Sequence, residues 1–330
     1  MLKKSPLLLL LLATLASAAS EATKNDNPAP AVAEESASEG SGSTRALPSL
    51  SASEGSASAQ QKSAPDEATA ARLAEAKAAY KNQEYDQARE LWQPLAEAGN
   101  ADAQNNLAIL YTKGQGVAQD YAQARQWFEK AAAAGHVKAQ SNLGLMYERG
   151  QGVERDYVQA REWFEKAAAT GHAQAQMHLG YLYDEGLGVP QDYAQAREWY
   201  EKAAAGGNDD ALFNLGLLYK NGKGVEQDYS QALEWFEKAA AAGHPPAQFH
   251  LGALYEKGQG LTKDYGQARQ WYEKAAEAGL AKAQYSLGSL YEDGLGVAAD
   301  PAKAREWYEK AAAQGHENAR EALRRLPAQN

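Results

Sequence analysis

The sequence predicts an all-α protein, a solenoid of stacked helix–loop–helix units. Tryptophan recurs every 36 residues, at Trp127, Trp163, Trp199, Trp235, Trp271 and Trp307. Within each period, apolar residues follow helical spacing in two stretches, and glycines mark where each stretch ends. A strict repeat of this length is typical of a supersecondary unit that buries its apolar face against copies of itself. Six such units fill residues 101–316.

The first unit, residues 101–136, shows the two helices that every unit is expected to contain. The apolar stripe of the first helix consists of Ala103, Leu107, Leu110 and Tyr111. The stripe of the second helix consists of Tyr121, Ala124, Trp127, Phe128 and Ala131. Residues three and four apart share one face of a helix, so each stripe can pack against a neighbouring helix.

Glycine, aspartate and histidine recur where these helices begin and end. Gly114 and its copies follow the first helices, and Gly135 and its copies follow the second, where a left-handed residue is favoured. Asp120 and its copies precede the second helices as expected N-caps. His136 has histidine copies in three further units, but Asn208 replaces it in the third, which indicates a polar turn rather than a metal ligand.

A glycine also recurs in the middle of the first helix in five units, beginning with Gly144. Glycine in a helix interior costs about 1 kcal/mol relative to alanine, so its recurrence indicates a steric demand. We expect the large rings of Tyr111 and Trp127 to fill the space beside this position in the first unit, and their counterparts, such as Tyr147 and Trp163 beside Gly144, to do the same in the other units.

The two ends of the solenoid are expected to carry caps. Residues 67–100 echo the repeat but lack its Gly-x-Gly-Val insertion, and they are interpreted as an N-terminal tetratricopeptide-like cap. Residues 317–330 can form one last helix that covers the other end. Solenoids need such terminal caps for solubility. The solenoid domain is therefore placed at 67–330.

The first 66 residues are expected to lie outside the solenoid. Residues 1–18 have the features of a secretory signal peptide, with Lys3 and Lys4 before the apolar run Leu7–Leu12 and a small-residue cleavage site at Ala16–Ala18. Residues 19–66 are rich in Ser, Ala, Glu and Gly, contain no aromatic residue, and are predicted to be a disordered linker. We expect an exported protein, periplasmic or secreted, without stable membrane insertion after signal cleavage. An uncleaved signal that anchors the chain in a membrane is the alternative.

Composition excludes several functional classes. The net charge of −10 becomes −12 without Lys3 and Lys4, and no basic stripe remains that could bind nucleic acid. The chain contains no cysteine, so helix stacking rather than disulfides must stabilise it. No set of residues suggests a catalytic triad, an acid–base pair, a metal site or a cofactor. The sequence therefore predicts a non-enzymatic protein.

The repeated pattern resembles a known family. Its core, Leu-Gly-x-x-Tyr followed by Gly-x-Gly-Val, Asp-Tyr-x-x-Ala-x-x-Trp and Lys-Ala-Ala-x-x-Gly, is similar to the Sel-1-like repeat, a longer relative of the tetratricopeptide repeat. The resemblance covers residues 101–316. It implies a right-handed α-solenoid that binds proteins or peptides as an adaptor, and exported bacterial members are common. One cysteine-rich branch is linked to β-lactam binding or hydrolysis, and this cysteine-free chain does not match it.

Three first-helix positions vary between units while their neighbours stay fixed. In related helical repeats the first helix lines the concave face, so we expect these positions to form a groove that is polar at its first end and aromatic further on. The candidate partner-binding residues are Asn105, Asn106, Asn142, Met177, His178, Tyr181, Phe213, Asn214, Phe249, His250 and Tyr285. The alternative, that the aromatic residues are ordinary core between adjacent units, stays open.

We therefore expect an exported scaffold that holds a protein or peptide partner in the groove, anchored by a few buried side chains. Two alternatives remain. One is an envelope hydrolase or glycan-binding protein, which needs a convergent polar pocket. The other is a structural spacer with an empty groove.

Overall fold

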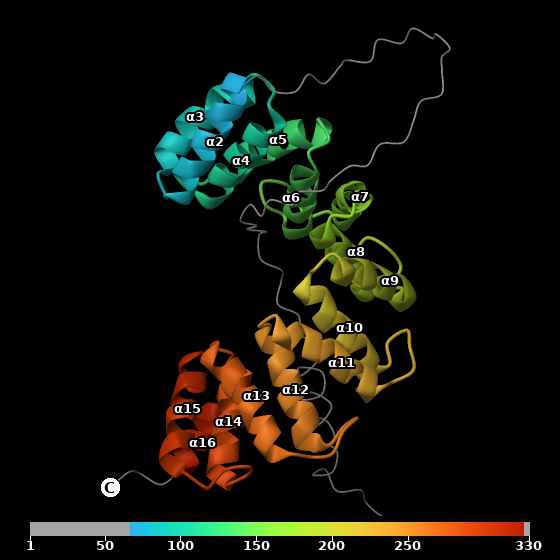
Figure 1. Ribbon diagram of the computed structural model, residues 1–330, viewed down its shortest axis with the longest axis vertical. Coiled ribbons are helices and arrows are strands. Elements are labelled where there is room, and N and C mark those ends of the chain that lie inside the picture. The colour runs from blue at the N-terminus through green and yellow to red at the C-terminus, as the bar shows by residue number, and fades with distance from the viewer. Residues whose placement is uncertain (1–66, 327–330) are drawn as a thin grey trace, which may run out of the picture. The chain divides into compact units, whose positions relative to one another are not determined.

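The computed structural model describes residues 67–326, which form fifteen helices and no strand (Figure 1). This confirms the all-α repeat fold. The described residues divide into two compact units, an N-terminal unit (67–166) and a C-terminal unit (167–326), with the division inside α7. The signal peptide and linker expected at 1–18 and 19–66 lie outside the described residues.

The N-terminal unit begins with the stretch expected to be the cap. Its helices are α2 (Glu67–Lys81), α3 (Tyr85–Glu97), α4 (Ala101–Lys113), α5 (Tyr121–Ala133), α6 (Val137–Arg149) and most of α7 (Tyr157–Ala168). From α2 to α6, consecutive helices pack against each other. The core between them contains Trp92, Leu107, Leu110, Phe128 and Leu143, all buried.

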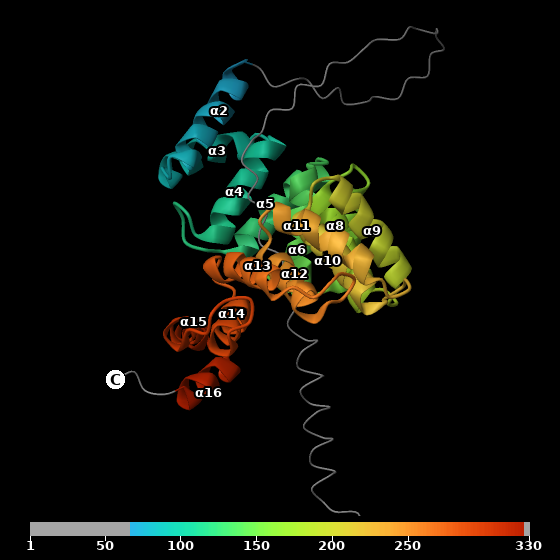
Figure 2. The same ribbon diagram turned by 60° about the horizontal axis from the view of Figure 1, so that its bottom comes forward.

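The C-terminal unit continues the same alternation. Its helices are α8 (Ala173–Glu185), α9 (Tyr193–Ala205), α10 (Asp209–Asn221), α11 (Tyr229–Ala241), α12 (Pro245–Lys257), α13 (Tyr265–Glu277), α14 (Ala281–Asp293), α15 (Pro301–Ala313) and α16 (Glu317–Arg325). Figure 2 shows α14 and α15 side by side, and α16 packs on α15. Helix α16 occupies the stretch expected to form the last helix.

The helix ends confirm the roles expected for aspartate and histidine. The Asp120 carboxylate accepts hydrogen bonds from the backbone nitrogens of Ala122 and Gln123, at 2.9 and 3.0 Å. Nδ1 of His136 accepts a bond from the Ala139 nitrogen at 3.1 Å, and the Asn208 amide caps α10 in the same way. A side-chain acceptor at this position satisfies a backbone donor that has no partner inside the helix, which explains why His and Asn exchange there.

The mid-helix glycines pack against a different ring from the one expected. A Cβ atom on Gly144 would lie 2.6 Å from the Phe164 ring, and one on Gly252 would lie 2.5 Å from the Tyr272 ring. The expectation that Tyr147 and Trp163 fill this space was therefore wrong. The residue after each tryptophan points toward the first helix of its own repeat, because it lies one helical position further round toward the core.

The tryptophans themselves lie at the edge of the core. Trp163 and its four later copies are half-buried, whereas Trp127 is 8% exposed. In every repeat the lysine three residues later places its ammonium over the indole ring, at 3.6 Å from the ring centroid for Lys166 and 4.2 Å for Lys238. This cation–π contact covers an aromatic face that would otherwise be exposed to water.

Candidate partner-binding surface

The first variable position, two residues before the recurring leucine, lies mostly in the core. Met177 is 2% exposed and Phe213 is 1% exposed. The Phe213 ring centroid lies 5.7 Å from that of Phe236 on the second helix of its repeat and 4.8 Å from that of His244, the N-cap of the next repeat. For these two residues the geometry favours the core alternative.

The same position becomes partly exposed further along the C-terminal unit. Phe249 and Tyr285 are half-buried. The Tyr285 ring stacks on His316 with centroids 4.7 Å apart, and Phe249 contacts Tyr272 at 5.5 Å. At the polar first end, Asn105 is buried. Phe249 and Tyr285 therefore pack against the edge of the core and also keep part of their surface exposed to solvent.

The second variable position holds mostly buried polar side chains in the C-terminal unit, where Ser286 is the half-buried exception, and half-buried ones in the N-terminal unit. His178, Asn214 and His250 are buried, with His178 fully inaccessible. Gln174 lies 3.2 Å from Nε2 of His178. Asn106 and Asn142 are half-buried. The two histidines therefore contact other side chains of the protein, Asn214 is shielded from solvent, and the two remaining asparagines keep accessible area.

His250 is held in its neutral form. Burial lowers its pKa well below the ordinary value of 6.5, and the charges of Lys220, Lys282 and Lys257, with His244, lower it further. Nζ of Lys220 lies 3.3 Å from Nδ1 of His250. Because an ammonium can only donate, Nδ1 accepts and the ring proton sits on Nε2. The imidazole also stacks on Phe236 at 5.2 Å.

Replacing His250 with asparagine, the residue found at this position in Asn106, Asn142 and Asn214, should weaken the acid sensitivity of the fold. In the native protein, stability is complete above pH 6.5 and falls as pH drops below it, because the unfolded chain binds a proton that the folded chain excludes. The slope approaches about 1.4 kcal/mol per pH unit for this one group. Urea unfolding between pH 7 and 5 measures it. Equal slopes for the variant and the native protein would contradict this account.

The third variable position, two residues after the leucine, presents apolar side chains at the surface. Tyr181 and Leu217 in the C-terminal unit are half-buried, as is Ile109 in the N-terminal unit. Leu145 is buried. Of the aromatic and aliphatic residues considered from sequence, Tyr181, Leu217, Phe249 and Tyr285 thus keep exposed area in the C-terminal unit. These four are called the apolar strip below.

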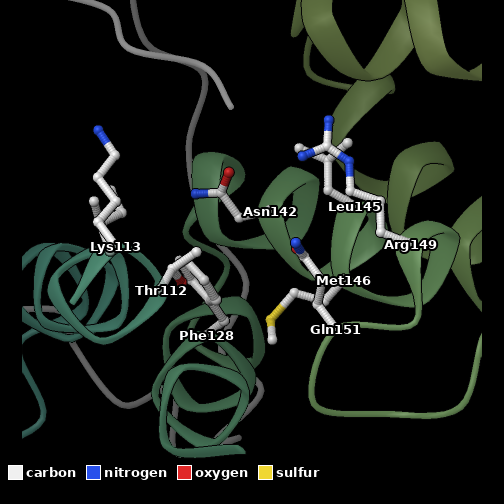
Figure 3. Close-up of a pocket in the computed structure, with 9 residues that line it drawn as sticks. Thr112, Lys113, Phe128, Asn142, Leu145, Met146, Arg149 and Gln151 are labelled. Atoms are coloured by element: carbon white, nitrogen blue, oxygen red, sulfur yellow. The ribbon is translucent and has the colours of Figure 1, made fainter. Parts of the chain in front are cut away.

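The last turn of the first helix also varies, and the sequence reasoning did not include it. The position reads Lys113, Arg149, Glu185, Asn221, Lys257 and Asp293 through the six repeats. In the N-terminal unit, Lys113 and Arg149 line a pocket between α4, α5 and α6 (Figure 3). Thr112, Asn142, Leu145, Met146 and Phe128 line it too. Comparing the repeats position by position would have identified this variable position in the last turn, because the charge of its side chain changes sign along the chain.

A carboxylate in the same turn binds a tyrosine of the second helix in three repeats. The Tyr272 hydroxyl donates to Glu256 at 2.6 Å and that of Tyr308 donates to Glu292 at 2.7 Å. Burial and the adjacent carboxylate raise the pKa of each tyrosine above its ordinary value. The phenols stay protonated and donate hydrogen bonds, so these pairs join helices and do not supply a base.

The third pair, Tyr200 with Asp184, carries a cation as well. Nζ of Lys223, from the loop of the next repeat, lies 3.2 Å from Asp184 Oδ1, and the Tyr200 hydroxyl lies 3.4 Å from Oδ2. Burial alone would lower the pKa of Lys223, but the Asp184 carboxylate outweighs burial and raises it. The ion pair between Lys223 and Asp184 therefore connects two successive repeats.

Lys223→Leu should destabilise the protein by about 1–2 kcal/mol at neutral pH, because it leaves the buried Asp184 carboxylate without its cation. Leucine fits the loop, since Leu187 and Leu295 occupy the equivalent positions. Asp184→Asn in the same chain should restore most of the loss. Urea unfolding of the four proteins in this double-mutant cycle measures the coupling free energy between Lys223 and Asp184. Strictly additive losses of stability would show that the ion pair does not stabilise the fold.

The stacked helix pairs and the variable first-helix surface define a helical-repeat protein. The chain belongs to the Sel1 repeat family: the Sel1 repeat model matches residues 101–136, 137–172, 173–208, 209–244, 245–280 and 281–316. Sel1 repeat solenoids generally mediate protein–protein interaction and are typically non-catalytic. No curated protein matches the chain.

Solved structures that are similar to the chain include two repeat proteins. A Sel1 repeat protein from Oxalobacter formigenes is 38% identical with a TM-score of 0.68, over 73% of this chain and 96% of that one. A protective antigen of uropathogenic Escherichia coli strains, which displays an SLR fold, is 40% identical with a TM-score of 0.69 over 78% of this chain. The chain spans 56% of the length of that antigen.

Between residues 67 and 326, no group of three or more His, Cys, Asp or Glu side chains is arranged to hold a metal ion. Within the same residues, no helix has both the length and the apolar character that a membrane span requires.

Proposed function

We propose that the protein is a non-enzymatic adaptor that binds a protein or peptide through the surface of its first helices. The observation that carries the proposal is the apolar strip. Tyr181, Leu217, Phe249 and Tyr285 break the repeat and keep exposed area, whereas the residues that recur in every unit are explained by capping and packing. Partly exposed aromatic and aliphatic anchors are the side chains that dominate most protein interfaces.

Burial narrows the set of residues that can meet a partner. Met177, His178, Phe213, Asn214 and His250 support the strip from below and are not contact residues in this conformation. Asn106 and Asn142 remain contact candidates in the N-terminal unit. A rigid surface of this kind binds without a large ordering cost, because its side chains are already held by the core beneath them.

Photocrosslinking tests the proposal in the organism that makes the protein. A photoreactive residue at Leu217 should give a discrete adduct with one partner, whereas the same residue at the exposed Glu234 on α11 should not. The adduct band is identified by mass spectrometry. Identical adducts from both positions, or none from Leu217, would contradict binding through the first helices.

We also propose that the adaptor works outside the cytoplasm. The support is the sequence of residues 1–18, with its lysines, leucine run and small-residue cleavage site. Mass spectrometry of the mature protein should find an N-terminus at Ala19. A mature chain that retains Met1 would contradict cleavage and favour the anchored alternative.

A further inference from the structure

The last helix of the C-terminal unit, α16, is packed from one side. It packs on α15, and no later helix follows it among the described residues; Figure 2 shows it at the end of the unit. Ala319 and Ala322 are buried in this contact, whereas Glu321 and Arg324 of the same helix are exposed. Segments with few buried contacts open locally at a lower free energy than the whole fold. Helix α16 can therefore open while the rest of the unit stays folded.

A histidine caps this helix. Nδ1 of His316 accepts a hydrogen bond from the Ala319 backbone nitrogen at 3.3 Å, and the imidazole stacks on the Tyr285 ring with centroids 4.7 Å apart. A protonated imidazole carries a hydrogen on both ring nitrogens, so it cannot accept this bond. Its positive charge would also lie at the positive end of the α16 dipole. Protonation of His316 therefore removes the cap and destabilises the helix that begins there.

Two other histidine caps have a carboxylate beside them. Nε2 of His136 lies 3.1 Å from Asp102 Oδ1, and Nε2 of His244 lies 3.2 Å from Asp210 Oδ1. In both cases the aspartate precedes the histidine by 34 residues and lies on the preceding first helix. A carboxylate stabilises an imidazolium that still donates to it through Nε2. At these two caps the aspartate offsets part of the cost of protonation.

His316 has a cation at the equivalent place. The residue that precedes it by the same interval is Lys282, on α14. Partial burial lowers the pKa of His316 below its ordinary value of 6.5, and the charge of Lys282 lowers it further. The folded protein therefore disfavours the protonated form of this imidazole, and the lysine adds to that effect where an aspartate would oppose it.

The lysine is the charge that acts on the imidazole, and other charged groups of the surrounding helices are engaged elsewhere. On α16, Glu317 pairs with Arg320. On α15, Lys310 lies over the indole ring of its own repeat. Between α16 and α14, Arg325 donates two hydrogen bonds of 3.0 Å to Glu292, and an exposed pair of this kind contributes little to stability.

We infer that α16 is an acid-labile cap: protonation of His316 at mildly acidic pH releases this helix from α15 while the rest of the C-terminal unit stays folded. The docked helix is fully stable above pH 6.5 and loses stability as the pH falls below it, because the released helix binds a proton that the docked helix excludes. Release frees the Tyr285 ring from its stack, which links pH to the apolar strip. That link rests on the proposed function, whereas the release itself does not.

Thiol labelling tests the release in the full-length protein, because the chain contains no cysteine of its own. Ala322→Cys places a thiol on the buried face of α16, and Glu321→Cys places one on its exposed face. The ratio of their labelling rates with dithiodipyridine at one pH measures the protection of the buried site, because the reactivity of the thiol cancels. Protection at Ala322 should fall severalfold between about pH 7.5 and 5.5, toward a limit of about tenfold for one proton.

A cap that does not titrate is the matched variant. His316→Asn should keep the helix capped, since Asn208 caps α10 through the same bond. Combined with Ala322→Cys, it should retain the protection seen at pH 7.5 and abolish the fall at pH 5.5. Lys282→Asp, which supplies the carboxylate found at the other caps, should make the fall smaller. If protection falls as much with His316→Asn as with the native histidine, the inference is wrong.

A second site shows whether α16 opens by itself. Asn214 is 3% exposed on α10, in the same unit. Asn214→Cys should be more protected than Ala322→Cys by about tenfold or more at both pH values, because its exposure requires a larger part of the unit to unfold. Equal protection at the two sites would show that α16 opens only together with the rest of the unit, which contradicts a separate cap.

These results are separable from the proposed function. If labelling shows no acid release while Leu217 still gives its crosslinked adduct, the adaptor stands and the acid-labile cap is lost. If Leu217 gives no adduct while α16 is released as expected, the acid-labile cap stands and the apolar strip is not the main interface.

Discussion

Gly296→Ala is expected to destabilise the protein by about 3 kcal/mol or more. Gly296 lies in the loop after α14 with φ of 66°, and a Cβ atom there would lie 2.4 Å from both the carbonyl carbon and the oxygen of Tyr265, at the start of α13. Both atoms belong to the backbone, so neither can move without shifting a helix. Glycine at this position lets one repeat pack closely against the previous repeat. The loss of unfolding free energy in the variant therefore measures how much this close packing stabilises the protein. Thermal and urea unfolding measure it.

Gly279→Ala is the matched control. Gly279 also has positive φ, 92°, but a Cβ atom there would meet nothing within 4 Å. Its replacement should cost only the conformational strain, about 1–2 kcal/mol. Equal losses in the two variants would show that strain alone explains the glycines and that the close approach between repeats contributes little.

Phe213→Ala is expected to cost about 3–5 kcal/mol, as for other buried phenylalanines. The ring is 1% exposed and contacts Phe236, His244 and His250, so its removal leaves a cavity between two repeats. The unfolding free energy of the purified variant gives the result. A loss this large would place Phe213 in the core.

Tyr181→Ala provides the comparison from the apolar strip. Because Tyr181 is half-buried, its removal should cost about 1 kcal/mol or less. Comparing the stability of the two variants distinguishes buried supporting residues from exposed contact residues along the first helices. If Phe213→Ala were as stable as the native protein, the division between buried support and exposed strip drawn here would be incorrect.

The sequence predicted the repeat fold and most helix ends because these depend on local chemistry. Asp120 and His136 cap helices through bonds to nitrogens two or three residues away, and Gly114 adopts φ of 67° at the end of α4. The aspartate and the glycine recur in every unit. The histidine is replaced by Asn208, which caps its helix in the same way, and by Leu280, which makes no side-chain cap bond. Periodicity alone was therefore sufficient to predict the repeat fold and most helix ends.

The candidate surface could be predicted only in part, because burial depends on the neighbouring helices. Phe213 and Tyr285 occupy the same repeat position, yet one is buried and the other half-buried. Both rings contact a histidine N-cap, His244 for Phe213 and His316 for Tyr285. Phe213 also packs against His250 of the next repeat, whereas the equivalent residue beyond Tyr285 is the small Ala322. Similarly, no period indicated that Phe164 rather than Trp163 would face Gly144, since both are large and apolar.

The most direct test of the central claim is partner capture by a variant that removes the exposed anchors and leaves the core intact. Tyr181→Ser with Leu217→Ser should reduce capture of the partner crosslinked at Leu217 by more than tenfold while the protein still melts cooperatively. Val158→Ser, which removes an exposed apolar side chain from a second helix, should leave capture unchanged. If the double variant captures the partner as well as the native protein does, binding through the first helices is wrong.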